Sequence, residues 1–469
     1  MSPVSLSLKA QIRQSAAHRQ TQVSLKQMVN FGRNVTPYTL LRSSTFLSRE
    51  LPIRLAKRIS ELDSLPLGLA TTPSVQRIRA LYEMSYADLA ALPAPPLLPA
   101  SLSLNLPPFE ADKTIVEVDS DLDAEAWKSP PAEIPKAVLE YNREFTECIT
   151  TVKTRDDRVA LTMAQGLSEV KKLGQSQQIS QQPNTMYPTI MPKHDEAAQN
   201  LLPFDLRAVL DRFYMSRIGM RFLIGQHIAL AKTCSDPAST TPGYVGIINT
   251  RVSIREVVAR ASQNAHTVLQ ATFPNLTVLP EIKLYIATPA SNPASKIDDV
   301  FFMYPPSHLH HMLFELFKNS LRATVQRHHN KAAINQISSA MLSSNALNEK
   351  NPFPPIAVVV AEGEEDVTIK ISDEGGGIPR SGLPLIWSYL YTTANMESFV
   401  KDGEERRRTM AGYANQPIFY GHGFGYGIPS ARLYARYFGG NLEVVSLEGH
   451  GTDVYIHVAR LGDNEEPLP

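Results

Sequence analysis

The segment from His308 to Arg327, HLHHMLFELFKNSLRATVQR, separates its polar and apolar side chains when it is drawn as a helix. At about 100° per residue, its leucines, phenylalanines and methionine gather on one side. The opposite arc combines a carboxylate, an amide and several bases. We therefore expect a helix that packs by one side and lines a site with the other. An ordinary amphipathic helix with a solvated polar side is the alternative. The residues of the polar arc are His311, Glu315, Lys318, Asn319 and Arg322.

A first glycine-bearing segment follows the strand-like run DVTIKIS. It reads Asp373-Glu374-Gly375-Gly376-Gly377. Successive glycines allow a sharp turn and close approach of the backbone to a ligand, while an aspartate at a strand end can accept a hydrogen bond from an exocyclic amine. Taken alone, the segment is equally compatible with an ordinary strand-to-helix turn.

Further glycines occur near the C-terminal end. They alternate from Gly421 to Gly427 and lead into the helical run IPSARLYARYF. Backbone N–H groups at such a helix start form a seat for phosphate. The spacing is not that of the dinucleotide-binding fingerprint, since glycine falls at every second position and no strand precedes it. A last segment, Gly451-Thr452-Asp453, places a hydroxyl at the start of the final strand.

The chain as a whole predicts two domains. Residues 23–240 carry apolar residues at helical spacing, with Pro37, Pro52 and Pro73 marking helix starts or stops, and include a proline-rich and a glutamine-rich insert. Residues 241–462 alternate β-branched strands with helices. We expect an N-terminal all-α helical bundle and a C-terminal α+β sandwich, a mixed sheet with helices on one face. Residues 394–420 are expected to form a lid, and residues 463–469 a short tail.

Charge and cysteine content narrow the class. Lys+Arg and Asp+Glu both number 46, which argues against a nucleic-acid partner, and two cysteines are too few for a disulfide framework. No run reaches the roughly 18 apolar residues of a transmembrane segment. Before Glu50 there are basic residues and no acidic ones, with many Ser, Gln and Ala. Residues 1–22 are therefore predicted to be a disordered mitochondrial presequence; a disordered basic tail is the alternative.

The order of these motifs resembles the nucleotide-binding boxes of the GHKL ATPase/kinase superfamily, which includes gyrase, heat-shock chaperones, histidine kinases and mismatch-repair ATPases. Five segments are similar in sequence to mitochondrial kinases of 2-oxo-acid dehydrogenase complexes, above all the pyruvate dehydrogenase kinases. They are HMLFELFKN, SDEGGGIP, YLYTTA, GFGYGIPSARLYARYFGG and SLEGHGTDVY. The N-terminal segments FLSRELPIRLAKRI and LDRFYMSRIGMRFLIGQH extend the resemblance over nearly the whole chain. It implies a Bergerat-type ATP-binding fold.

Residue roles follow from the chemistry and agree with this resemblance. Glu315 is expected to act as general base toward a serine hydroxyl, with His311 orienting or tuning it. Asn319 would complete a Mg²⁺ site whose other ligands are phosphates and waters. Lys318 and Arg322 would neutralise phosphate charge.

The remaining expected contacts are with the nucleotide. Asp373 would hold the adenine amine, supported by Thr452. Gly375 and Gly377 would form the adenine-side turn. The resemblance adds Thr392 and Thr393. The segment that would wrap the phosphates comprises Gly421, Gly423, Phe424, Gly425, Tyr426, Gly427 and Ile428.

The expected function is that of an ATP- and Mg²⁺-dependent protein-serine kinase of the mitochondrial matrix. It would phosphorylate and inactivate the E1 component of the pyruvate dehydrogenase complex, with the E1 alpha subunit as substrate, the lipoyl domain of the E2 core as docking partner, and a homodimer as the assembly. The chain ends GDNEEPLP, without the longer aromatic-bearing tail of that family. Arg217, Arg221 and His227 fall where the family binds small regulatory acids; surface or intrahelical ion pairing is the alternative.

Three other functions stay open. The first is a kinase of the branched-chain 2-oxo-acid dehydrogenase, which GTDVYIHV favours. The second is a GHKL conformational ATPase, in which a carboxylate at the same place activates water. The third is a histidine-directed kinase, which the missing H-box disfavours.

Overall fold

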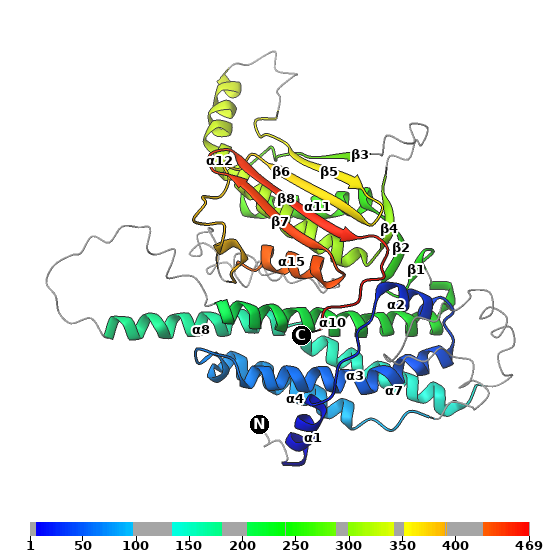
Figure 1. Ribbon diagram of the computed structural model, residues 1–469. Coiled ribbons are helices and arrows are strands. Elements are labelled where there is room, and N and C mark those ends of the chain that lie inside the picture. Colours follow the sequence, from blue (N-terminus) through cyan, green and yellow to red (C-terminus); the bar gives the residue numbers. More distant parts are fainter. Residues whose placement is uncertain are drawn as a thin grey trace. The chain divides into compact units, whose positions relative to one another are not determined.

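The computed structural model describes residues 6–96, 134–180, 204–239, 241–287, 299–341, 351–389, 391 and 425–468 (Figure 1). The chain divides into two compact units. The helical unit comprises residues 1–166, 216–248 and 468–469, and the sheet unit comprises residues 167–215 and 249–467. The division falls within two long helices and again between residues 248 and 249, whereas the sequence predicts a single boundary near residue 240.

Sequence signals explain where several helices of the helical unit begin. Ser24 forms a capping box with Gln27, and Thr36 and Thr72 each accept a hydrogen bond from a backbone N–H of the following first turn. Pro37 and Pro73 occupy the first helical turns, as predicted. The helices are α1 (Leu6–Ala16), α2 (Leu25–Gly32), α3 (Pro37–Asp63), α4 (Pro73–Ala90), α7 (Lys136–Asp156), α8 (Val159–Ser180) and α10 (Phe204–Ser235), with short 3-10 turns η1 (Leu69–Thr71) and η2 (Pro237–Ser239).

One predicted helix boundary is wrong. Pro52 lies inside α3, which continues to Asp63. Leu51 and Leu55 flank it and are almost completely buried. Packing of this apolar side stabilises the helix through the proline, although the proline removes one backbone hydrogen bond.

The expectation that residues 1–22 are disordered is also wrong for the described residues of that stretch. Helix α1 packs against α3, and Ile12 is buried. The Ser15 hydroxyl lies 2.8 Å from the Tyr86 hydroxyl. The Thr21 N–H donates to Glu50, while Arg54 donates to the Thr21 carbonyl. Buried contacts therefore order a segment whose composition alone is that of a presequence.

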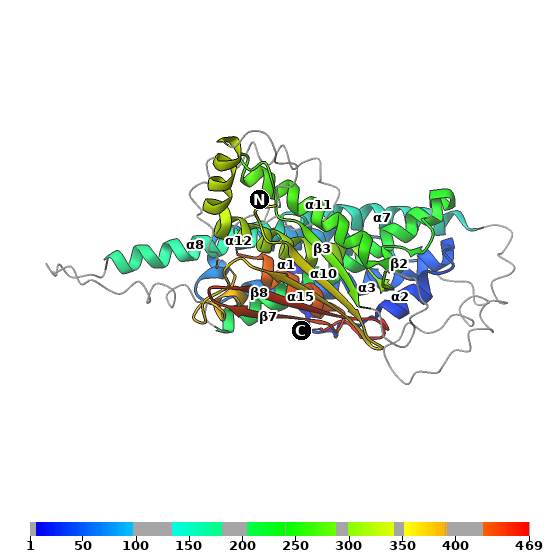
Figure 2. The same ribbon diagram turned by 90° about the horizontal axis from the view of Figure 1, so that it is seen from above.

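The sheet unit contains a five-stranded sheet, which is mixed as predicted (Figures 1 and 2). Strand β3 pairs parallel with β5, and the other pairs are antiparallel. In the order of the sheet, the strands are β3 (Ile282–Ala287), β5 (Ile356–Glu362), β6 (Asp366–Asp373), β8 (Gly451–Ala459) and β7 (Asn441–Leu447). Separately, β2 (Ile248–Ser253) pairs antiparallel with β4 (Phe301–Tyr304), and β1 (Tyr244–Val245) precedes β2.

Strand periodicity explains the layers of the sheet unit. Along β6, Val367, Ile369 and Ile371 are completely buried, while the residues between them are partly exposed. Helices α11 (Ile254–Thr272), α12 (Pro306–Met341) and α15 (Gly427–Tyr437) pack together and contact the sheet (Figure 1). The predicted apolar side of α12 is buried, including Leu313 and Phe317. The two-domain fold class is therefore confirmed.

The remaining predicted segments fall partly outside the described residues. The expected lid, 394–420, lies outside them entirely, as do residues 97–133 and 181–203 of the two inserts. Part of the predicted tail is described: Glu466 is buried and accepts a hydrogen bond from the Tyr437 hydroxyl of α15. Among the described helices, none has a sufficiently long apolar stretch to cross a lipid bilayer.

Candidate active site

The polar side of α12 carries a buried carboxylate beside a helix start. Glu315 is only 3 % exposed, and the Nζ of Lys318 lies 2.7 Å from its Oε2. Its Oε1 has no hydrogen-bond partner among the described residues. A β-carbon added to Gly427 would lie 2.6 Å from Glu315 Oε2 and 3.5 Å from the Asn319 amide nitrogen. The backbone at the start of α15 therefore lies directly against Glu315 and Asn319.

The same stripe of α12 continues to the aspartate–glycine turn. A β-carbon on Gly375 would lie 2.5 Å from that of Ala323, and one on Gly376 would lie 2.7 Å from Arg327 Cδ. Residues 315, 319, 323 and 327 are each four apart, so they share one side of the helix. From Glu315 to Ala323 the stripe spans about 12 Å. One helix thus touches both glycine segments, which are far apart in sequence.

Asp373 lies at the end of β6 with its carboxylate held by backbone donors. Its Oδ1 accepts a hydrogen bond of 2.9 Å from the Gly375 N–H. Burial raises the pKa of this carboxyl, and hydrogen bonds from Ser320 and from the backbones of Gly375 and Thr452 partly offset that rise. Thr452 is directly opposite Asp373 in the β6–β8 register. The predicted Asp373–Thr452 pair is therefore brought together.

Gly377 turns the chain where another side chain would not fit. Its φ of 72° is in the left-handed region, and a β-carbon there would lie 2.1 Å from the Leu447 carbonyl oxygen. The next residue, Ile378, donates its N–H to the Ser446 hydroxyl, which lies 2.9 Å from the Thr452 hydroxyl. The turn is thus bound to the β7–β8 hairpin.

His311 is placed differently from the expectation. Its Nε2 lies 3.3 Å from the Ser430 hydroxyl on α15, and that hydroxyl donates to the Gly427 carbonyl. The ion-pair partner of Glu315 is Lys318. Burial lowers the pKa of His311 to about 3, with further lowering by Lys318 and His310, so the ring is neutral near pH 7. The neutral ring holds the start of α15.

The remaining predicted residues divide into two groups. Arg322 is half-buried on α12, and burial lowers its pKa. Gly425, with φ of 72°, lies against the Tyr391 backbone, whose carbonyl oxygen is 2.2 Å from the position of an added β-carbon. Tyr426 is buried and Ile428 is half-buried. Outside the described residues lie Thr392, Thr393, Gly421, Gly423 and Phe424.

Sequence reasoning missed three residues at this site. Arg327 donates to the Gly449 carbonyl and lies against Gly376; its position, twelve residues after Glu315, is the signal that could have identified it. Ser430 and Tyr391 belong to the site only through contacts with His311 and Gly425. No local pattern indicates such contacts.

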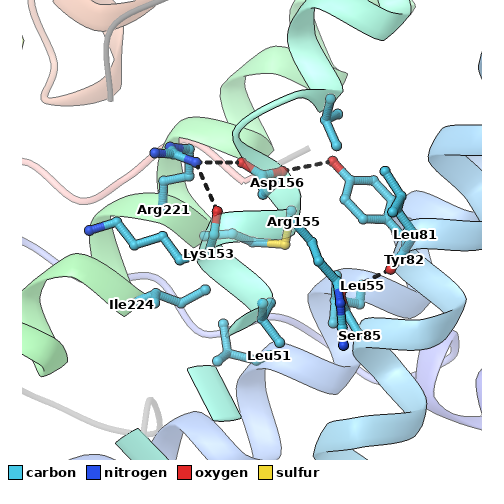
Figure 3. A pocket seen from close by; sticks show the side chains of 13 residues that line it. Leu51, Leu55, Leu81, Tyr82, Ser85, Lys153, Arg155, Asp156, Arg221 and Ile224 are labelled. Carbon is cyan, nitrogen blue, oxygen red and sulfur yellow. Dashed lines mark hydrogen bonds and ion pairs between the residues drawn. The ribbon is translucent and has the colours of Figure 1, made fainter. Parts of the chain in front are cut away.

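Arg217 and Arg221 lie in the helical unit, where Figure 3 shows Asp156 between Arg221 and Tyr82. The Asp156 Oδ2 is 3.0 Å from a guanidinium nitrogen of each arginine, and all three residues are buried. Asp156 and Arg221 border a cavity of only about 10 Å³. Both arginines are ion-paired, but to a buried aspartate of α7, whereas the alternative expected a surface or intrahelical ion pair. His227 instead contacts the hydroxyls of Ser43 and Thr146.

The geometry and two family comparisons define the class of protein. Residues 305–461 match the model for histidine kinase-, DNA gyrase B- and HSP90-like ATPases. Residues 22–249 match the model for the mitochondrial branched-chain alpha-ketoacid dehydrogenase kinase. The sheet unit is therefore an ATP-binding domain of the GHKL class.

Whole-chain comparisons give the family. The chain is 36% identical to a mitochondrial pyruvate dehydrogenase (acetyl-transferring) kinase of Schizosaccharomyces pombe over 100% of both chains. It is 37% identical to the Arabidopsis thaliana kinase of the same name, over 96% of this chain and 93% of the relative. Identity to the human isozyme 1 is 33%, over 95% of this chain and 79% of that one. The chain belongs to the mitochondrial pyruvate dehydrogenase kinase family and is a protein kinase.

Proposed function

We propose that this protein transfers the γ-phosphoryl group of ATP to a serine hydroxyl of the pyruvate dehydrogenase E1 alpha subunit and thereby inactivates the complex. The mitochondrial matrix is the proposed compartment, since the relatives are named mitochondrial kinases. The observation that carries the proposal is the Glu315 carboxylate. It lies against the start of α15, and its Oε1 has no hydrogen-bond partner among the described residues.

Glu315 would accept the serine proton through Oε1 as the serine oxygen attacks the γ-phosphorus and ADP leaves. The Lys318 ion pair holds the other carboxylate oxygen and so orients the base. Lys318 and Arg322 also supply positive charge toward the transferring group. Helix α15 begins at Gly427, so its N-terminal N–H groups suit phosphate oxygens.

Asn319 is the proposed Mg²⁺ ligand. Its amide lies beside Glu315 at the start of α15, where phosphates would bind. The described residues contain no group of three or more His, Cys, Asp or Glu side chains that could hold a metal ion. One protein oxygen with phosphates and waters is the donor set that Mg²⁺ commonly accepts. The ion would neutralise charge on the β- and γ-phosphates.

Asp373 is the proposed adenine-binding residue. Its carboxylate lies at the opposite end of the α12 stripe from Glu315, which separates base recognition from phosphoryl transfer. Thr452 and the Gly375–Gly377 turn would support the adenine. The Gly375 N–H already orients the carboxylate.

Two partner contacts are proposed on separate surfaces. The outer face of the sheet exposes Tyr285, Val445 and Leu447, which suits sheet pairing in a homodimer. The helical unit has a cavity of about 150 Å³, lined by residues that include Gly32, Val35 and Cys234. The proposed ligand of this cavity is a thin aliphatic group such as a lipoyl arm.

The match of residues 22–249 to the branched-chain kinase model favours a second candidate substrate, the branched-chain 2-oxo-acid dehydrogenase E1. Labelled Mg-ATP should be offered to purified pyruvate and branched-chain E1 in parallel, each with its own lipoyl core. Transfer to pyruvate E1, lost with Glu315→Gln, is expected. Transfer only to branched-chain E1 would change the substrate. ATP hydrolysis without labelling of either E1 would favour a conformational ATPase.

A further inference from the structure

Three tyrosines form a buried cluster in the sheet unit. They are Tyr214 on α10, Tyr389 after the 3-10 turn η3 (Leu385–Trp387), and Tyr426 before α15. Ring centroids are 5.3 Å apart for Tyr214–Tyr389, 5.8 Å for Tyr214–Tyr426 and 5.2 Å for Tyr389–Tyr426. Such distances are typical of stabilising aromatic pairs. All three residues belong to the same compact unit.

The cluster is connected to the proposed phosphate-binding segment through the backbone. Tyr426 is the residue between Gly425 and Gly427. Tyr389 is two residues before Tyr391, whose backbone atoms lie 2.2 to 2.7 Å from the position of a β-carbon on Gly425. The rings therefore act on both chain segments that meet at Gly425. A shift of either ring would move the start of α15 relative to Glu315.

Helix α10 also contributes a charged contact. The Tyr389 hydroxyl donates to Asp211 Oδ1 at 2.5 Å, and Asp211 is half-buried. The guanidinium of Arg432 from α15 lies 4.4 Å from the centroid of the Trp387 ring, which belongs to η3. The η3 segment is thus held by α10 through a hydrogen bond and by α15 through a cation–π contact.

We propose that Asp211 and Tyr214 of α10 are positioning residues for ATP binding. They act through Tyr389 and Tyr426 to hold the Gly425–Gly427 segment against α12, without touching the nucleotide themselves. The inference rests on the proposed function, because it assigns ATP to this segment. Asp211 and Tyr214 precede Gly425 by more than two hundred residues. The inference therefore adds a distant part of the chain to the nucleotide site.

The test uses the full chain and measures Mg-ATP affinity by calorimetry, with KM values for ATP and for E1. Tyr389→Phe removes only a hydroxyl and should raise the Kd for ATP about fivefold. Tyr214→Ala should raise it about tenfold, and Tyr214→Phe should restore most of the affinity because it keeps the ring. The KM for E1 should not change. The double variant Asp211→Ala/Tyr389→Phe should bind ATP no more weakly than Asp211→Ala alone, because both substitutions remove the same hydrogen bond.

The matched control is Tyr82→Phe, which removes another buried tyrosine hydroxyl that donates to an aspartate, but in the helical unit. It should leave the Kd for ATP unchanged. If Tyr389→Phe, a variant that keeps the ring and the fold, binds ATP as tightly as wild type, the positioning role is wrong. If Tyr389→Phe and Tyr82→Phe weaken ATP binding equally, the effect is general and the inference also fails. Absence of ATP binding by the wild-type chain would instead overturn the proposed function.

Discussion

Lys318, which is partly exposed, and Glu315, which is buried, form an ion pair one helical turn apart on α12, with 2.7 Å between Nζ and Oε2. This contact uses one carboxylate oxygen, and the other has no hydrogen-bond partner among the described residues. Lys318 is itself 5.3 Å from the centroid of the Phe314 ring, which limits its movement. The pair therefore presents one oxygen of a fixed carboxylate to the site.

Glu315→Gln should strongly reduce phosphoryl transfer while ATP still binds. The amide keeps the size of the side chain but cannot accept the serine proton, so kcat should fall by about 10² to 10⁴. Single-turnover transfer and ATP affinity should be measured together. A variant with wild-type kcat would exclude Glu315 as the base.

Gly377→Ala should disrupt the adenine-side turn more than Gly449→Ala. Both glycines have positive φ, but a β-carbon at Gly377 meets the Leu447 carbonyl at 2.1 Å, whereas one at Gly449 meets nothing within 4 Å. Backbone strain of about 1–2 kcal/mol is common to both substitutions. The difference between their losses of stability therefore measures the clash of the added β-carbon with the Leu447 carbonyl. Urea unfolding and ATP affinity would show it. Equal losses would contradict the described turn.

Four buried histidines should make stability fall in mild acid. Burial lowers the pKa of His227, His308 and His311 to about 3 and that of His310 to about 4. The unfolded chain takes up protons as pH falls through about 6.5, while the folded chain does not. The stability from keeping these rings neutral is therefore full above about pH 6.5 and is lost progressively toward pH 4.

Unfolding should be measured between pH 5 and 8 for wild type and for His227→Gln. Each neutral buried histidine contributes a slope of up to roughly 1.4 kcal/mol per pH unit below its unfolded pKa. The variant should therefore show a shallower dependence. An identical slope would mean that His227 titrates normally in the folded chain.

Asp156→Ala should destabilise the helical unit by about 3 kcal/mol, because it leaves Arg217 and Arg221 buried without their shared carboxylate. Asp157→Ala is the matched control. Its carboxylate also pairs with Arg221, but the side chain is 54% exposed, so its loss should stay below about 1 kcal/mol. Similar effects of the two substitutions would show that burial does not strengthen the Asp156 contacts.

Removal of residues 1–16 should lower the thermal stability of the purified protein. The deletion takes away Ile12 and the Ser15–Tyr86 contact. Burial of one isoleucine side chain contributes about 1.5–3 kcal/mol to stability, and the deletion loses this contribution. Differential scanning calorimetry of the two chains gives the comparison. Unchanged melting would show that α1 adds nothing to the stability of the helical unit.

Most of the sheet unit could be predicted from local patterns. Alternation in β6 determines which side chains are buried, and helical spacing on α12 puts Glu315 and Asn319 on the side opposite Leu313 and Phe317. The glycine requirement at Gly377 is likewise local, since only glycine readily adopts its φ. The fold class and the main candidate residues therefore follow from the sequence.

The partners of those residues could not be predicted in the same way. His311 binds Ser430 rather than Glu315, and Tyr389 meets Asp211 from 178 residues earlier in the chain. Residues 6–16 form a packed helix despite a presequence-like composition. Periodicity specifies which side of an element is apolar. Packing between elements distant in sequence decides which polar groups then meet, because burial requires each of them to find a partner.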